Sequence, residues 1–130
     1  MTTVLFACVR NAGRSQMAAG FFNALVDPAT ARAISAGTRP ADRVDPIVVQ
    51  AMREAGIDLS SHAPRLLTTG LARDAQRLIT MGCGDECPVV SGVVRDDWPL
   101  EDPAGQPIER VRAIRDAIRA RVAALVAAIR

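Results

Sequence analysis

A short, uninterrupted apolar run near the start of the chain constrains the fold more than any other feature. The run Val4–Ala7 contains no polar residue, which is typical of a strand buried on both faces of a sheet. It ends at Cys8, a polar stretch with a glycine follows as far as Gly13, and a helical pattern begins there. Because strands covered on both faces occur mainly in parallel sheets, this start predicts an α/β fold.

Three helices are predicted from the spacing of apolar residues. The first follows Gly13 and stops before Pro28. The second has Asp45 as its N-cap, Pro46 in its first position and Gly56 as its C-terminal stop. The third occupies the end of the chain. The expected apolar faces are Met17, Phe21, Ala24 and Leu25, then Ile47, Val48, Ala51, Met52 and Ala55, then Ile108, Val111, Ile114, Ile118, Val122, Leu125 and Ile129.

The predicted strands alternate with these helices. Residues 32–35 and 77–81 are expected strands, 93–95 a weaker one, and 64–74 a short helix or an irregular turn. This alternation indicates one α/β domain over residues 1–130, with a parallel sheet. Ligands bind such sheets outside the carboxyl ends of the strands. The segments expected there are 8–14, 35–37, 82–87 and 96–102, so all three cysteines fall on one edge of the sheet.

Composition excludes several classes of protein. Hydrophobic residues make up 49% and charged residues 23% of the 130, which is unlike a disordered chain. No apolar run approaches the ~20 residues of a bilayer span, and the N-terminus lacks the basic region of a signal peptide, so we expect a cytoplasmic protein. All 16 basic residues are arginine, but the net charge of +2 does not favour a nucleic-acid partner. Cysteines of a cytoplasmic protein are more often catalytic or metal-binding than structural disulfides.

The segment from Cys8 to Arg14 predicts an oxyanion site. A tight loop at the start of a helix presents its backbone N–H groups to an anion, and an arginine fork can pair with two of the anion's oxygens. The same field favours the thiolate of Cys8, which would lie below the anion, ready to attack. No other phosphate-loop motif is present. The alternative is a buried strand-end cysteine and a surface arginine. The residues expected to surround the anion are Val9, Arg10, Asn11, Ala12, Gly13, Arg14 and Ser15.

Residues 4–22 resemble the active-site region of the low-molecular-weight tyrosine phosphatases, and NAGRSQMA at 11–18 is similar to their arsenate reductase branch. The resemblance continues through SAG at 35–37, TMGCGD at 80–85, Trp98 and DPAG at 102–105, so it covers essentially the whole chain. It implies a four-stranded parallel sheet flanked by helices, and reduction of arsenate to arsenite without a metal or cofactor. Phosphate and sulfate are the expected competing oxyanions.

The resemblance also implies roles for single residues. Transferred by position, Cys8 is the nucleophile, Arg14 the oxyanion clamp and Asp102 the general acid that protonates the departing oxygen. The supporting roles are a hydrogen bond from Ser15 to the Cys8 thiolate, and a loop shape held by Asn11 and Ser35.

Cys83 and Cys87 favour a reductase over a phosphatase, which needs one cysteine. Attack by Cys83 on the arsenic-bearing Cys8 would release arsenite and leave a Cys8–Cys83 disulfide. Cys87 could then attack Cys83 and move the disulfide outward to thioredoxin. Gly82 and Gly84 provide backbone freedom beside Cys83.

Several alternatives stay open at this point. The electron donor could be mycothiol with mycoredoxin, and Cys87 could be uninvolved. A zinc site of Cys83, Cys87 and His62 would lack a fourth ligand.

Ala19 replaces a glutamate that some relatives use near a potassium ion, so no potassium site is expected. A tyrosine phosphatase is disfavoured by Ala104, where phosphatases usually carry tyrosine. A non-catalytic oxyanion-binding module would not need the thiols. We expect a monomer.

Overall fold

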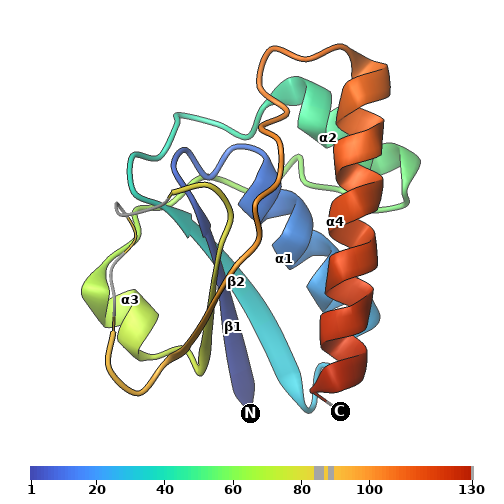
Figure 1. The fold of residues 1–130 in the computed structure, drawn as a ribbon. Helices are drawn as coiled ribbons and strands as arrows, with labels where there is room; N and C mark the ends of the chain where they lie inside the picture. The colour runs from blue at the N-terminus through green and yellow to red at the C-terminus, as the bar shows by residue number, and fades with distance from the viewer. Residues whose placement is uncertain (84–86, 88–89, 130) are drawn as a thin grey trace.

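The fold is a four-stranded parallel sheet flanked by helices, as predicted (Figure 1). The structure is a computed structural model that describes residues 1–83, 87 and 90–129. Gly84, expected to give backbone freedom beside Cys83, lies outside the described residues. The strands, in sheet order, are β2 (Ala31–Gly37), β1 (Thr2–Cys8), β3 (Arg77–Thr80) and β4 (Val94–Asp97). The helices are α1 (Arg14–Leu25), α2 (Pro46–Glu54), α3 (Thr69–Arg73) and α4 (Ile108–Ala128).

Strand β1 is buried on both faces, which explains its unbroken apolar sequence. Val4 and Phe6 join the core beneath α1, α2 and α4, whereas Leu5 and Ala7 join a second core on the side of α3. None of these four side chains is exposed to solvent. Figure 1 shows α1 and α4 on one side of the sheet and α3 on the other. The carboxyl end of β1 therefore emerges between two packed layers, which fixes the position of Cys8.

The buried face of α1 differs from the predicted one. Met17 and Phe21 are buried as expected, but Ala24 is exposed and Leu25 is 41% exposed. Phe22 is fully buried in their place, and its ring packs edge-on against Phe6 at a centroid distance of 6.1 Å. Helix α1 contacts both the sheet and α4, so its buried arc is determined by two neighbouring elements and not by its own apolar pattern.

The other elements lie close to their predicted positions. Of residues 64–74, only Thr69–Arg73 is helical, and the Thr68 hydroxyl caps it by accepting a bond from the Leu71 amide at 3.0 Å. Helix α2 ends at Glu54, and the predicted stop residue Gly56 follows two positions later with a φ of +83° that suits glycine. The Ile57 amide there donates to the Met52 carbonyl at 2.9 Å, which closes the turn. The weak fourth strand is present at Val94–Asp97.

Helix α4 packs its predicted apolar face against the core and turns arginines outward. Its buried side chains are Val111, Ile114, Ile118 and Val122, with Val126 in addition. Arg112 and Arg115 form ion pairs with Glu54 of α2 at 2.7 and 3.2 Å, so these arginines connect two helices of the same chain. Within the described part of the chain, no helix has the length and apolar character needed to cross a membrane.

Candidate active site

A cavity of about 270 Å³ opens above Cys8 at the carboxyl end of the sheet. Cys8 is the last residue of β1 and Arg14 is the first of α1, so the connecting loop forms the floor of the cavity. Gly82, which follows β3, and Asp102, which precedes α4, approach from the other side. The lining residues are Cys8, Val9, Arg10, Ala12, Gly13, Arg14, Asp45, Gly82 and Asp102.

The loop's backbone carbonyls point away from the cavity. Four of them accept hydrogen bonds from the segment that leads from β2 to α2. Because a trans peptide directs its C=O and the next N–H in opposite directions, the amides of residues 9, 10, 11 and 13 point the other way, toward the cavity. This is the arrangement that binds an anion. The pairs are Thr38 to Cys8 (3.2 Å), Arg39 to Val9 (2.8 Å), Ala41 to Arg10 (2.9 Å) and Asp45 to Ala12 (3.0 Å), amide to carbonyl.

Gly37 allows β2 to approach the loop this closely. A Cβ on Gly37 would lie 2.6 Å from the Val9 carbonyl oxygen and 2.9 Å from the Asn11 amide nitrogen. Any other residue would therefore push the loop away from the sheet. Ser35, expected to support the loop, pairs with Phe6 inside the sheet and is partly buried. The close contact with the loop comes two residues later, at Gly37.

Asn11 is fully buried and holds the loop's shape from inside. Its φ of +52° is left-handed, a region that asparagine tolerates better than most residues. Its side-chain amide donates to the Ser15 hydroxyl at 2.7 Å, and its side-chain oxygen accepts from the Arg65 amide at 3.0 Å. Gln16 donates to the same oxygen at 3.2 Å and to the Asn11 carbonyl at 3.1 Å. Gln16 is a supporting residue that the sequence did not reveal.

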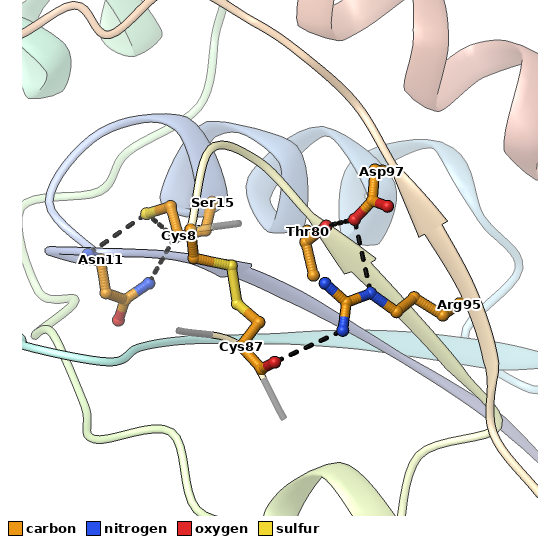
Figure 2. Close-up of a disulfide and its surroundings, with 8 residues drawn as sticks. Cys8, Asn11, Ser15, Thr80, Cys87, Arg95 and Asp97 are labelled. Carbon is orange, nitrogen blue, oxygen red and sulfur yellow. Dashed lines mark hydrogen bonds and ion pairs between the residues drawn. A yellow bond between two sulfur atoms is a disulfide. The ribbon is translucent and has the colours of Figure 1, made fainter. Parts of the chain in front are cut away.

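The sulfur of Cys8 has two hydrogen-bonding partners. The Ser15 hydroxyl lies 2.9 Å from it, and the Asn11 amide donates to it at 3.3 Å (Figure 2). Cys8 is only 2% exposed. These two contacts hold the sulfur in a fixed position at the floor of the cavity. The geometry thus suits a nucleophile that is shielded from solvent except through the cavity.

Arg14 is held in place by three groups from two segments of the chain. Its Nη1 donates to the Leu100 carbonyl at 3.0 Å, and its Nη2 lies 3.6 Å from a carboxylate oxygen of Asp102. Gly82, with a φ of +97°, packs its main chain directly against the guanidinium. The Arg14 side chain is 11% exposed whereas that of Asp102 is 54% exposed, so the arginine is fixed and the carboxylate stands at the mouth. Asp102 also accepts a bond from the Ala104 amide at 3.0 Å.

Cys83 and Cys87 are joined by a disulfide and are both buried. Their Cα atoms are 5.7 Å apart, a normal separation for a disulfide. Arg95 of β4 donates to the Cys87 carbonyl at 3.4 Å and to Asp97 at the same distance; Thr80, at the end of β3, donates to the same carboxylate (Figure 2). One carboxylate therefore connects the strand that leads to Cys83 with the arginine that contacts Cys87.

A family model described as low molecular weight phosphotyrosine protein phosphatase matches residues 3–130. The chain belongs to this family. Among its relatives, the glutaredoxin arsenate reductase of Synechocystis sp. is 37% identical over 132 residues and aligns over 99% of both chains.

Two solved structures of related proteins share the fold. The thioredoxin-dependent arsenate reductase of Corynebacterium glutamicum has a TM-score of 0.86 and 36% identity; the match covers 99% of this chain and 62% of that one. An arsenate reductase in the phosphate-binding state has a TM-score of 0.87 and 34% identity, with all of both chains covered.

In this member of the phosphatase family, Asp45 occupies the predicted N-cap position of α2, and its carboxyl is new to the site. Asp45 precedes α2 as expected, but its side chain makes no capping hydrogen bond. It lines the cavity instead, beside the loop. Burial raises the pKa of Asp45; Arg10 acts against this effect and Asp102 adds to it. The sequence pattern before Pro46 indicates a helix cap, and nothing in it shows that Asp45 lies on the wall of the cavity above Cys8.

The alternative zinc site is not assembled. Cys83 and Cys87 are bonded to each other, and His62 is exposed beside a different cavity, lined also by Arg43 and Arg53. Among the described residues, no cluster of three or more His, Cys, Asp or Glu side chains could hold a metal ion.

Proposed function

We propose that this chain is a cytoplasmic enzyme that reduces arsenate to arsenite through Cys8. One observation carries the proposal: a disulfide-forming pair of cysteines begins directly after Gly82, a residue of the cavity wall above Cys8. Ester hydrolysis needs one cysteine, whereas arsenate reduction needs a source of two electrons, and two thiols that become a disulfide supply two electrons.

Arsenate would bind in the cavity as a tetrahedral oxyanion. The inward amides of the loop and the two N–H groups of the Arg14 fork are suited to its oxygens. The related reductase in its phosphate-binding state supports this assignment, because phosphate has the same shape and charge pattern.

In the first step the Cys8 thiolate attacks arsenic and a sulfur–arsenic bond forms. The bond from arsenic to the opposite oxygen breaks, and Asp102 delivers a proton so that the oxygen leaves as water. Arsenic remains As(V) in this adduct. The position of Asp102 at the mouth of the cavity, 3.6 Å from Arg14, supports its role as the acid.

In the second step the Cys83 thiolate attacks the sulfur of Cys8. The sulfur–arsenic bond breaks, its electron pair stays on arsenic, and As(III) leaves as arsenite. A Cys8–Cys83 disulfide remains. Cys87 then attacks Cys83, which releases the Cys8 thiolate and leaves the Cys83–Cys87 disulfide for an external dithiol to reduce. The Cys83–Cys87 disulfide of this structure supports that final exchange, because it joins the same two sulfurs.

Thioredoxin is the proposed external reductant. The named Corynebacterium structure supports a thioredoxin, and the named Synechocystis relative supports a glutaredoxin as the other candidate. A small thiol such as mycothiol would act on the arsenic adduct directly and would not need Cys87.

Arsenite formation by the purified chain tests the proposal. Arsenate would be supplied with thioredoxin and its reductase, with glutathione and glutaredoxin, or with mycothiol and mycoredoxin, and hydrolysis of p-nitrophenyl phosphate would be measured in parallel. We expect arsenite with thioredoxin, lost in Cys8→Ser and in Cys83→Ser. Rapid ester hydrolysis without arsenite from any donor would instead identify a phosphatase.

A further inference from the structure

Asp45 has a fixed position on the wall of the oxyanion cavity. Its backbone amide donates to the Ala12 carbonyl at 3.0 Å, and its carbonyl accepts from the amides of Val48 and Val49 at 2.9 and 3.0 Å. The residue is thus tied to the loop on one side and to α2 on the other. Its partly buried side chain makes no bond to the helix end and lines the cavity with Asp102.

A second carboxylate in this cavity needs a physical reason. The charged groups that act on Asp45 are Arg10 of the loop, Asp102 from the segment before α4 and Arg43 of its own segment. Arg14 lines the same cavity. A carboxylate repels an anion that carries no proton. Burial of Asp45 raises the pKa of its carboxyl. An ionised carboxyl can only accept hydrogen bonds, so it attracts an anion that offers a hydroxyl group.

Tetrahedral oxyanions differ in this property. Arsenate and phosphate keep at least one hydroxyl at neutral pH, whereas sulfate keeps none. We propose that Asp45 determines specificity: its carboxylate accepts a hydrogen bond from the hydroxyl of the bound oxyanion, so that the cavity prefers arsenate and phosphate to sulfate. Discrimination of this kind combines one attractive contact with one repulsive one. The inference rests on the proposed function, because it takes the cavity above Cys8 as the oxyanion site.

Protection of Cys8 from alkylation measures the preference without turnover. All three cysteines are among the described residues, and with Cys83 and Cys87 joined, Cys8 is the free thiol. Iodoacetamide labelling of the oxidised protein would be followed by mass spectrometry at neutral pH, against increasing sodium phosphate or sodium sulfate at matched ionic strength. For each anion, the concentration that halves the labelling rate is determined. The value for sulfate divided by the value for phosphate is the sulfate-to-phosphate ratio.

The isosteric Asp45→Asn variant removes the charge and keeps a good helix-cap residue. We expect its ratio to fall about tenfold, because sulfate binds more tightly and phosphate more weakly. Asp42→Asn is the matched control: it removes the same charge from an exposed position three residues away and should leave the ratio unchanged.

Three outcomes would overturn the inference. An Asp45→Asn ratio within twofold of wild type, or an equal fall in Asp42→Asn, would show that Asp45 does not select the anion. Equal protection of the wild type by both anions would do the same and leave the proposed function intact. No protection by either anion would instead remove the oxyanion site, and with it the proposed function.

Discussion

The guanidinium of Arg14 lies directly against the main chain of Gly82. A Cβ on Gly82 would overlap Nη1 of Arg14 and would lie 3.0 Å from its Cζ. Gly82 is the residue before Cys83, so the proposed anion clamp and the segment that carries the cysteine pair share one contact.

This contact makes Gly82→Ala a test of coupling between Arg14 and the segment that carries Cys83. The added methyl must displace the Arg14 fork, and a small misplacement in an active site can reduce the rate by up to about a hundredfold. We expect kcat/KM for arsenate to fall by more than about tenfold. Gly92→Ala is the control, since its φ of +85° is equally left-handed but no atom lies within 4 Å of the new Cβ. Equal losses in both variants would attribute the effect to backbone strain alone.

Arg14→Lys should abolish most turnover. Lysine keeps the charge, but its single nitrogen lacks the planar fork that can pair with two anion oxygens while another N–H donates to the Leu100 carbonyl. We expect kcat/KM to fall by about 10² or more, as for loss of one oxyanion donor. Arg73→Lys, at an exposed position of α3, is the control and should keep the wild-type value. Steady-state arsenite formation measures both. Activity in Arg14→Lys near the wild-type value would remove Arg14 from the site.

The cysteine variants should stop at different covalent states. Cys83→Ser should form the arsenic adduct of Cys8 but no disulfide to it. Cys87→Ser should complete one turnover and accumulate Cys8–Cys83, since no third thiol resolves it. Wild type given arsenate without reductant should end with Cys83–Cys87. Mass spectrometry of non-reduced peptides distinguishes these states. Normal multiple turnover of Cys87→Ser with thioredoxin would contradict the role of Cys87.

Substitutions of Asn11 should separate its backbone conformation from its hydrogen bonds. Both Asn11→Gly and Asn11→Ala lose the contacts with Ser15 and Arg65. Only alanine also resists the left-handed φ of +52°. We therefore expect urea unfolding to show both variants destabilised, with alanine worse than glycine by about 1 kcal/mol. Equal stabilities would mean that the loop relaxes to another φ.

The raised pKa of Asp45 predicts how stability depends on pH. A carboxyl whose pKa is higher in the folded state binds more protons there, so it stabilises the fold below its ordinary value of 3.8 and loses that contribution as the pH rises through the folded pKa. We expect Asp45→Asn to gain stability relative to wild type as the pH rises above 3.8. Urea unfolding over a pH series, with Asp42→Asn as the control, measures this difference. A difference that does not vary with pH would contradict it.

The amino-acid sequence by itself determined the local features of the site. The apolar run before Cys8, the glycine at position 13 and the helix that starts at Arg14 specify a strand, a loop and a helix in adjacent positions, and parallel topology then places the cysteines at one edge. These features depend on neighbours within a few residues, and the local spacing of apolar residues predicts such features well.

Only the tertiary structure decided which distant groups complete the site. Asn11 accepts a bond from the amide of Arg65, 54 positions away, and Arg14 donates to a carbonyl 86 positions away. The position of Asp45 on the cavity wall, beside a loop more than 30 positions earlier in the chain, is of the same kind. A pattern of apolar residues carries no record of such contacts, because they arise when separate elements pack and their polar groups find partners in the folded chain.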